Sequence, residues 1–486
     1  MLEIRLAEHA PIHIHLRNGR RFDEPPAIEG YLDRIKPNSQ TKQQVYLTTH
    51  NGNLFILNTH MAFPPMPPGL APMTIESLDL QALRHAEIRR GINQIITATG
   101  VCDLRSILAV RRAFQVTPTH KHDQKEAAAD DMPWFGIWEN SEQRTTEDEE
   151  DEGGDSGLHK STDRTRLKMR RSLELLFNTG HVVRFEVFFQ CLRRVSAELH
   201  PYIFFPQAYS CQVAIEWIER LRALIFYWTS RHKIDAKQEI ELAQARRPRL
   251  TPQTRLCQAE EHPPEAPPDL SAPFAAMHNL YNWCVLDGCR SIVKMGRIYM
   301  KKGLHGQYKY VIKGWLNSML KFLFGRLFQL CLLAGHLVHF RIDAHSSLYT
   351  STRTNINLLD AYVMSGYFAA QTLPRGQYMP NAEPCPRRYH DGLETDDREE
   401  DVLFMVYYRP FPQMVNADQD PTKTPMNVKS IPKLSTKHKM LVFKARSNLE
   451  RDAWCWALNA EIEKIVRAQK DREHKLRETG NLAKLG

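Results

Sequence analysis

Short alternating runs of apolar residues recur in the first part of the chain and predict β-strands. Residues 28–35 (IEGYLDRI) form one run, and VYLTT and LFILN flank the dipeptide Asn51-Gly52. An Asn-Gly pair between two apolar runs predicts a tight hairpin, because its type I′ turn requires positive φ at both central residues. The runs RSLELLF and HVVRFEVFF flank residues 178–180 (NTG) and predict a second hairpin. This part of the chain therefore predicts an antiparallel sheet.

Helical spacing replaces this alternation after residue 210. Apolar side chains recur there at i, i+3, i+4 and i+7, and charged side chains lie off that face, which is typical of an amphipathic helix. The apolar face comprises Ala214, Trp217, Ile218, Leu221, Leu224 and Ile225. Residues 231–274 are charged and then rich in proline, and they predict a linker.

The same order of elements returns in the second half of the chain. Strand-like segments begin near residue 281, namely GRIYM, QYKYVI, GHLVHFRI, INLLDAYVMSGY and DVLFMVYY. Ser447 and Glu450 form a Ser-x-x-Glu capping box, which predicts that a final helix begins there. The apolar stripe of that helix is Trp454, Ala457, Leu458, Ile462 and Ile465.

Each half thus ends in one helix with a tryptophan on its inner face, Trp217 or Trp454. This pattern predicts an α+β, mainly β fold. We expect two bent antiparallel β-sheets, each capped by a C-terminal α-helix that the tryptophan anchors, with disordered insertions and a disordered linker. The predicted divisions are an N-terminal segment (1–23), a first unit (24–232) interrupted by an insertion (64–170), a linker (233–280), a second unit (281–469) and a polar tail (470–486).

Two parts of the predicted insertion differ in character. Helical spacing is present in places between Ser77 and Ile96, whereas residues 147–155 (EDEEDEGGD) form a solvated acidic run. We interpret the acidic run as disordered, with an acidic docking peptide as the alternative.

Composition and charge narrow the class of protein. The 486 residues include 65 Lys plus Arg and 56 Asp plus Glu, giving a net charge of +9, and 42% are hydrophobic. These values exclude a wholly disordered chain, a collagen and a disulfide miniprotein. Neither a secretory signal nor an apolar run of the roughly 20 residues that span a bilayer is visible. The nine cysteines form no CxxC pair, so we expect reduced thiols and a cytosolic location.

Several segments resemble the pleckstrin homology (PH) domain. They are EGYLDRI, VVRFEVF, AYSCQVAIEWIERLRALIFYW, GRIYMKK and SNLERDAWCWALNAEIEKI. The segments CVLDGCRSIVKMGRIYMKK, INLLDAYVMSGYF and DGLETDD further resemble the fungal sporulation proteins that carry two PH domains, of the prospore or forespore membrane type. Residues 189–207 and 313–329 interrupt strands that this resemblance would continue. They are either genuine loop insertions or retained introns of a gene prediction.

The chain offers little that suggests catalysis. It contains no GxGxxG, GxxxxGK[ST], HExxH or GxSxG motif. Cys331, His336 and His339 are close in sequence, as are His13 and His15, but neither group has the further pair that a tetrahedral zinc site needs. We therefore expect neither an enzyme nor a metal site, and no cofactor.

The resemblance implies a phosphate-binding face made by basic residues of the first two strands of each unit and their loop. In the first unit the matching residues are Arg34, Lys36 and Lys42, and in the second they are Arg297, Lys301, Lys302, His305 and Lys309. Both sets are incomplete, because Gln44 and Val311 occupy the positions where the pattern would place a further basic residue.

These observations predict a non-enzymatic, cytoplasmic, peripheral membrane adaptor. By resemblance it would act in growth and shaping of the forming spore membrane, binding anionic lipids or phosphoinositides and recruiting partners such as a large lipid-transfer protein. Two weak sites on one chain would gain avidity. The alternative is a protein-interaction scaffold without direct lipid binding. Nucleic acid is not an expected partner, because the basic runs at 163–171 and 246–255 contain no aromatic residues.

Overall fold

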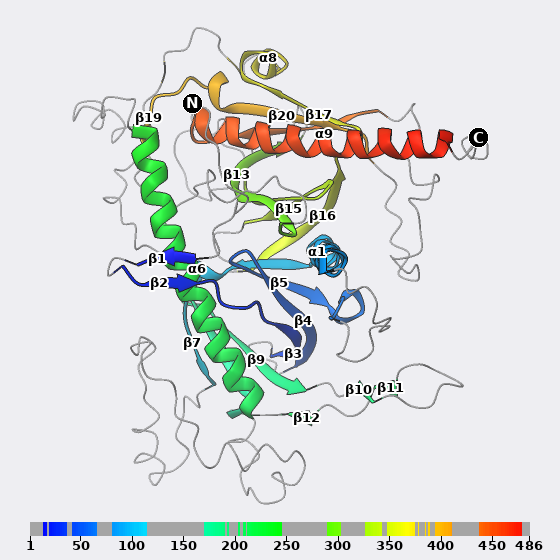
Figure 1. Ribbon diagram of the computed structural model, residues 1–486. Helices are drawn as coiled ribbons and strands as arrows, with labels where there is room; N and C mark the ends of the chain where they lie inside the picture. The colour runs from blue at the N-terminus through cyan, green and yellow to red at the C-terminus, as the bar shows by residue number, and fades with distance from the viewer. Residues whose placement is uncertain are drawn as a thin grey trace, which may run out of the picture.

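The computed structural model places the elements of the chain as Figure 1 shows. The described residues are 13–16, 19–35, 41–65, 80–113, 170–189, 192–193, 203–204, 208–209, 211–244, 289–302, 326–342, 348–374, 378, 384, 387–388, 394–410 and 437–478. The acidic run at 147–155 and the strand-like segment QYKYVI lie outside them.

The first unit is an antiparallel sheet whose first strand also pairs with its last. Its strands are β3 (Glu29–Ile35), β4 (Lys42–His50), β5 (Asn53–Asn58), β6 (Gly100–Asp103), β7 (Ile107–Arg112), β8 (Ser172–Phe177) and β9 (Val182–Phe189). Strand β3 pairs with both β4 and β9, which wraps the sheet around a core. Helix α6 (Cys211–Gln244) packs on β7, β8 and β9 and closes that core.

The second unit repeats this topology. Its strands are β13 (Ile292–Lys302), β14 (Arg326–Leu333), β15 (His336–Arg341), β16 (Tyr349–Asn357), β17 (Ala361–Ser365), β20 (Leu403–Tyr408) and β21 (Lys439–Lys444). Strand β13 pairs with both β14 and β21, as β3 pairs with β4 and β9. Helix α9 (Asn448–Glu478) closes the second core. The predicted fold class of two antiparallel sheets with C-terminal helices is confirmed.

Shorter elements surround the two units. They are β1 (His13–His15), β2 (Arg21–Asp23), η1 (Thr59–Met61), α1 (Leu80–Thr97), η2 (Leu104–Ser106), β10 (Leu192–Arg193), β11 (Ile203–Phe204), β12 (Ala208–Tyr209), α8 (Gly366–Gln371), β18 (Arg387–Arg388), β19 (Glu394–Thr395) and η4 (Glu400–Val402). The β1–β2 hairpin packs on α6 through Phe22, whose ring meets that of Phe226 edge to face at 5.3 Å between centroids.

The two units share one sheet. Strands β6 and β16, the fourth strand of each unit, pair antiparallel, with Tyr349 opposite Val101 and Thr350 opposite Gly100. This pairing joins the units into a single sheet of 15 strands within the described residues. At Gly100 a side chain would meet the carbonyl oxygen of Tyr349 at 3.2 Å, so glycine permits the close approach.

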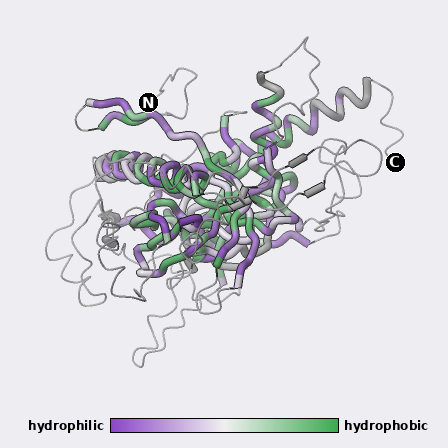
Figure 2. The backbone as a smooth tube through the Cα atoms, turned by 90° about the horizontal axis from the view of Figure 1, so that it is seen from below, coloured by the Kyte–Doolittle hydropathy of each residue, from purple (hydrophilic) through white to green (hydrophobic). Residues whose placement is uncertain are grey.

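A third hydrophobic core lies between the units and confirms that they are packed together. Helix α1 contributes Ile92 and Ile95, and the second unit contributes Met295, Val338 and Phe340. In Figure 2 the hydrophobic stretches of the backbone gather in the middle of the molecule. The burial of apolar surface therefore continues from one unit into the next rather than stopping at a linker.

Both helix tryptophans lie in the cores of their units. Trp217 is 5% exposed and packs in the first core, and Trp454 is 0% exposed and packs in the second. The predicted helix start is confirmed, because the Glu450 backbone N–H donates to the Ser447 hydroxyl at 3.2 Å. The Glu450 carboxylate accepts from the Arg446 backbone N–H at 3.0 Å, so only the serine half of the capping box forms. The Asp397 carboxylate accepts from the Asn448 backbone N–H at 2.9 Å and satisfies a second donor of the helix start.

The structure differs from the predicted divisions in three places. Residues 80–112, predicted to belong to an insertion, form α1, β6 and β7 of the first unit. Residues 326–329, predicted to interrupt a strand, are the beginning of β14. Helix α6 continues to Gln244, twelve residues beyond the predicted end of the unit at 232. In the first two cases strand pairing with distant segments recruits residues whose own pattern is too short to reveal a strand, whereas α6 is simply a longer helix than predicted.

The segment between β9 and α6 begins and ends at the same place. Ala208 and Tyr209 of β12 pair with Phe189 and Phe188 of β9. Residues 189–207 were predicted to interrupt the continuation of this strand, and the residue after them, Ala208, lies beside Phe189 in the sheet.

Replacing Gly52 by alanine is expected to destabilise the chain by about 2 kcal/mol or more. Asn51 and Gly52 have φ of 45° and 75°, which confirms the predicted hairpin turn, and a Cβ at Gly52 would lie 2.8 Å from the Trp228 ring. Gly180 is the matched control, because it has φ of 80° but open space around it. Urea unfolding of Gly52→Ala and Gly180→Ala compares the two, and equal losses would contradict a role for the Trp228 contact.

Candidate functional site

The head-group residues predicted in the first unit lie at the end of β3 and the start of β4. Arg34 is half-buried in β3, where burial lowers the pKa of its guanidinium. Lys42 begins β4, and its Nζ lies 2.6 Å from the Glu186 carboxylate and 3.7 Å from that of Asp33. Lys36 lies outside the described residues. The charge of Lys42 is therefore already balanced by two buried carboxylates of the chain.

The residues predicted in the second unit are separated by the structure. Lys301 and Lys302 form the end of β13, opposite Val442 and Leu441 of β21. His305 and Lys309 lie outside the described residues. Arg297 lies farther back in the same strand and is 8% exposed.

Arg297 belongs to the junction between the units, which corrects its predicted role in head-group binding. Its Nη2 donates to the Asp103 carboxylate at 3.2 Å and to the Tyr349 hydroxyl at 3.2 Å. The guanidinium also lies 5.8 Å from the centre of the Tyr349 ring. Asp103 is in the first unit and Tyr349 in β16, so this buried arginine connects the first unit to two strands of the second.

The charge state of Asp103 follows from its neighbours. Burial alone would raise the pKa of this carboxyl, but the guanidiniums of Arg105 and Arg297 outweigh burial and hold its pKa below the usual range. Arg105 donates from Nε to Asp103 Oδ1 at 2.7 Å, and its backbone N–H donates to the same oxygen at 3.0 Å. Asp103 therefore stays ionised at neutral pH between two arginines, one from each unit.

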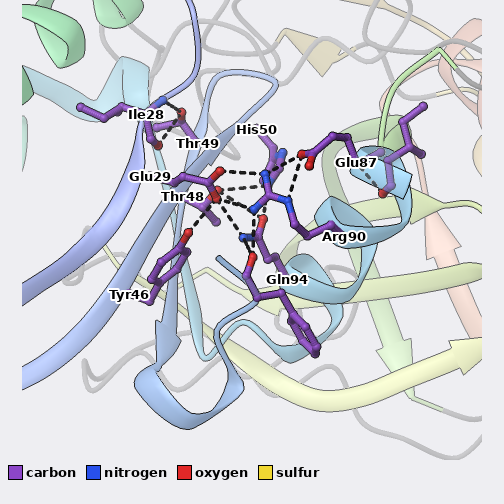
Figure 3. Close-up of polar contacts among 12 residues, drawn as sticks. Ile28, Glu29, Tyr46, Thr48, Thr49, His50, Glu87, Arg90 and Gln94 are labelled. Carbon is purple, nitrogen blue, oxygen red and sulfur yellow. Dashed lines mark hydrogen bonds and ion pairs between the residues drawn. The ribbon is translucent and has the colours of Figure 1, made fainter. Parts of the chain in front are cut away.

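A second buried polar cluster fastens α1 to the first sheet (Figure 3). Arg90 donates to both carboxylate oxygens of Glu29, at 2.7 and 2.8 Å. The Tyr46 hydroxyl and the Gln94 amide donate to the same carboxylate at 2.8 and 2.9 Å. Burial would raise the pKa of Glu29, but these hydrogen bonds and the Arg90 charge lower it. The carboxylate is saturated with donors, so its role is to position α1 rather than to transfer protons.

His50 extends this cluster without an acid–base partner. Its Nε2 lies 3.1 Å from the Gln94 carbonyl oxygen and 3.2 Å from the Thr48 hydroxyl. Burial is the largest influence on the ring and lowers its pKa, so His50 is neutral near pH 7. Because its ring is neutral and bonded to an amide and a hydroxyl, His50 contributes hydrogen bonds that support the fold.

A pocket of about 350 Å³ opens where the two units and α1 meet. It is lined on three sides by Arg84 and Arg90 of α1, Trp228 of α6 and Arg290 at the start of the second unit. Arg290 donates to the Glu24 carboxylate at 2.8 Å, and Arg90 holds Glu29. Two of its three arginines are thus engaged by the chain's own carboxylates, which weakens the pocket as an anion site.

The described residues do not gather the ligands of a metal site. Among them no three His, Cys, Asp or Glu side chains are grouped to hold a metal ion. Cys331 packs in the core between the units, whereas His339, opposite Leu330, contacts Phe328 on the other face of the sheet. In that same part of the chain, no helix is long and apolar enough to cross a membrane.

Comparison with known proteins identifies the second unit. Residues 324–475 match the sequence profile of the family described as the pleckstrin homology domain. The chain contains a PH domain. The match begins two residues before β14 and leaves β13 out, although β13 pairs with both β14 and β21 and completes the PH sheet. Residues 303–325 separate β13 from β14 in the chain.

The full chain is also similar to a curated fungal protein. It is 22% identical over 497 aligned positions to the forespore membrane adapter protein MUG56 of Schizosaccharomyces pombe. The alignment covers 95% of this chain and 44% of that protein, so the chain spans less than half the length of its relative. The resemblance to fungal sporulation proteins with PH domains, stated from the sequence, is confirmed.

Reasoning from sequence missed the residues that join the two units. Asp103 ends a four-residue strand within the predicted insertion, and Tyr349 begins a strand that no alternation marks. The only local signal was the helical spacing over residues 77–96, which corresponds to α1.

Proposed function

We propose that this chain is a non-enzymatic peripheral membrane adaptor that acts in fungal sporulation, at the forming spore membrane. The observation that carries the proposal is the PH domain in a chain similar along 95% of its length to a forespore membrane adapter. Such an adaptor binds anionic lipids or phosphoinositides from the cytoplasmic side and recruits partners, among them a large lipid-transfer protein.

The occupied basic residues shape the proposed mode of binding. Lys42 forms an ion pair with the Glu186 carboxylate, and Arg297 forms one with Asp103 at the junction of the two units. With these two residues engaged, the remaining basic residues would hold a phosphate weakly, and binding would depend mainly on attraction to an anionic surface. Each basic residue near such a surface contributes about 1 kcal/mol, so several weak contacts suffice for reversible attachment.

Reversing the charge of Lys301 and Lys302 together is expected to weaken vesicle binding at least about tenfold, because two favourable contacts become repulsive. The full chain is mixed with phosphatidylcholine vesicles containing phosphatidylserine, with and without phosphoinositide, and sedimented at low salt. Lys233→Glu/Lys470→Glu changes the net charge equally at exposed positions on α6 and α9 and serves as the control.

Three results of this experiment are informative. Loss of binding only in Lys301→Glu/Lys302→Glu supports a head-group site at the end of β13. Equal weakening of both double variants shows attraction to net charge alone. No sedimentation of the unchanged chain with any vesicle would contradict membrane binding and favour the protein-interaction scaffold, whose PH units bind proteins only.

A further inference from the structure

Helix α8 holds two aromatic side chains outward on the second unit. Its inner residues Ala369 and Ala370 are both 0% exposed and pack against Met405 of β20 and neighbouring apolar residues. Tyr367 and Phe368, on the same short helix, are 50% and 69% exposed. The rings cannot turn inward without lifting the alanines from the sheet, so their exposure is a property of the packed fold.

The sheet beside α8 continues this surface. Tyr362 of β17 is 51% exposed and stacks on Tyr407 of β20, with ring centroids 4.8 Å apart and planes at 4°. Tyr407 lies opposite Met440 of β21, so the three side chains form one row across three strands. Tyr407 and Met440 also pack against the cluster that holds the α8 alanines. We call the surface formed by Tyr362, Tyr367, Phe368, Tyr407 and Met440 the aromatic face.

Basic residues stand where β21 begins, beside one end of the aromatic face. The His438 ring lies 6.2 Å from that of Tyr362, whereas Lys439 is opposite Tyr408 and on the other side of the strand from Met440. Lys437, His438 and Lys439 precede and begin β21 and are exposed. Among the described residues, neither Lys437 nor Lys439 has a carboxylate partner within 4 Å. The nearby carboxylate of Asp360 is already engaged by Arg409 at 2.9 Å and lies 3.9 Å from His438. This end of β21 therefore carries exposed positive charge beside the aromatic face.

We propose that the aromatic face lies on an anionic bilayer, with its rings at the level of the lipid head groups and Lys437 and Lys439 near the phosphates. Tyrosine suits this position because an apolar ring and a polar hydroxyl occupy the two sides of the interface. Transfer of the phenylalanine ring out of water lowers the free energy of the bound state. Attraction of the lysines to the anionic surface lowers it further.

The geometry favours a bilayer over a peptide as the occupant. The aromatic face is formed by a sheet surface and a short helix, whereas the pocket described above lies at the junction of the two units. A broad face of exposed rings with positive charge beside it matches a fluid anionic surface, which needs no complementary groove. The proposal rests on the proposed function, because it names the surface by which the adaptor contacts its membrane.

The test uses the full chain and vesicles of phosphatidylcholine and phosphatidylserine without phosphoinositide. Phe368→Asp is expected to weaken binding at least about tenfold, because a charge replaces the most exposed ring. Val466→Asp, on α9 and 40% exposed, makes a matched change outside the face and is expected to bind as the unchanged chain does. Lys437→Glu/Lys439→Glu is expected to weaken binding at low salt and to differ little from the unchanged chain at high salt.

A fluorescence measurement distinguishes loss of the membrane contact from misfolding of a variant. Phe368→Trp keeps an aromatic ring, and brominated lipid is expected to quench its added fluorescence beyond the quenching of the unchanged chain. Added fluorescence that brominated lipid leaves unquenched while the protein is bound would overturn the proposal. Undiminished vesicle binding by a folded Phe368→Asp would also overturn it and leave the face to a protein partner. Failure of the unchanged chain to bind any vesicle would overturn the proposed function itself and, with it, this inference.

Discussion

Replacing Trp454 by alanine is expected to lower the free energy of unfolding by about 3–5 kcal/mol. Trp454 is the largest fully buried side chain among the described residues and anchors α9 in the second core. The Lys294 ammonium also lies 5.0 Å from the centre of its ring, so the substitution removes a cation–π contact together with the packing. Urea unfolding followed by far-ultraviolet circular dichroism measures the loss.

Trp456→Ala is the matched control, two residues along the same helix. Trp456 is 50% exposed, so its replacement is expected to cost less than about 1 kcal/mol. The comparison shows whether the loss of stability comes from removing a buried indole or from removing any tryptophan of α9. A similar loss in the two variants would contradict the assignment of Trp454 as the residue that anchors α9.

Replacing Arg297 by methionine is expected to cost about 3 kcal/mol, because it leaves a buried carboxylate with one of its two guanidiniums. Asp103 keeps Arg105, which places the expected loss at the low end for a broken buried pair. Since Arg297 connects the first unit to β16 through Asp103 and Tyr349, we also expect a single unfolding transition to separate into two. Urea unfolding followed by tryptophan fluorescence and by circular dichroism detects the separation.

The pH dependence of this effect has a definite sign. The pKa of Asp103 is lower in the folded chain than in the unfolded chain, so its ion pairs stabilise the fold above about pH 4. That contribution is lost as the pH falls through the lowered folded pKa. The difference in stability between the unchanged chain and Arg297→Met should therefore narrow in acid, and a difference that stays constant from pH 7 to pH 3 would contradict an ionic role.

Arg467→Met is the control for the junction variant. Arg467 pairs with Glu463 on the surface of α9, where the two side chains are 74% and 61% exposed. An exposed pair of this kind contributes about 0.3–0.5 kcal/mol, so its loss should leave both the stability and the single transition unchanged within error. The contrast tests whether burial at the junction, rather than charge pairing itself, makes Arg297 important.

Features that depend on neighbours in the chain could be predicted from sequence. The turn at Asn51 and Gly52 follows from backbone sterics, and the start of α9 at Ser447 and Glu450 follows from local hydrogen bonding. The apolar stripes with Trp217 and Trp454 follow from helical periodicity. These signals were enough to predict two sheet-and-helix units, because each unit closes around its own helix.

The candidate site could be predicted only in part. Arg297 stands on a strand of the PH pattern beside other basic residues, and the resemblance implied that it contacts phosphate. Its partner Asp103 is 194 residues away and lies in a strand of four residues, too short for alternation to reveal. The aromatic face likewise combines β17, β20, β21 and α8, and none of these segments by itself shows which side will be covered.

The sequence by itself determined two PH-like units, their hairpins and the helices that close them, because those features arise from contacts within a turn, a helix or one hairpin. Only the tertiary structure decided that β6 and β16 pair, so that one sheet runs through both units. It also decided which basic residues stay exposed, since Arg297 is buried against Asp103 whereas Lys437 and Lys439 are exposed. Whether a residue is buried depends on which distant part of the chain packs against it, and the local sequence pattern does not show which part that will be.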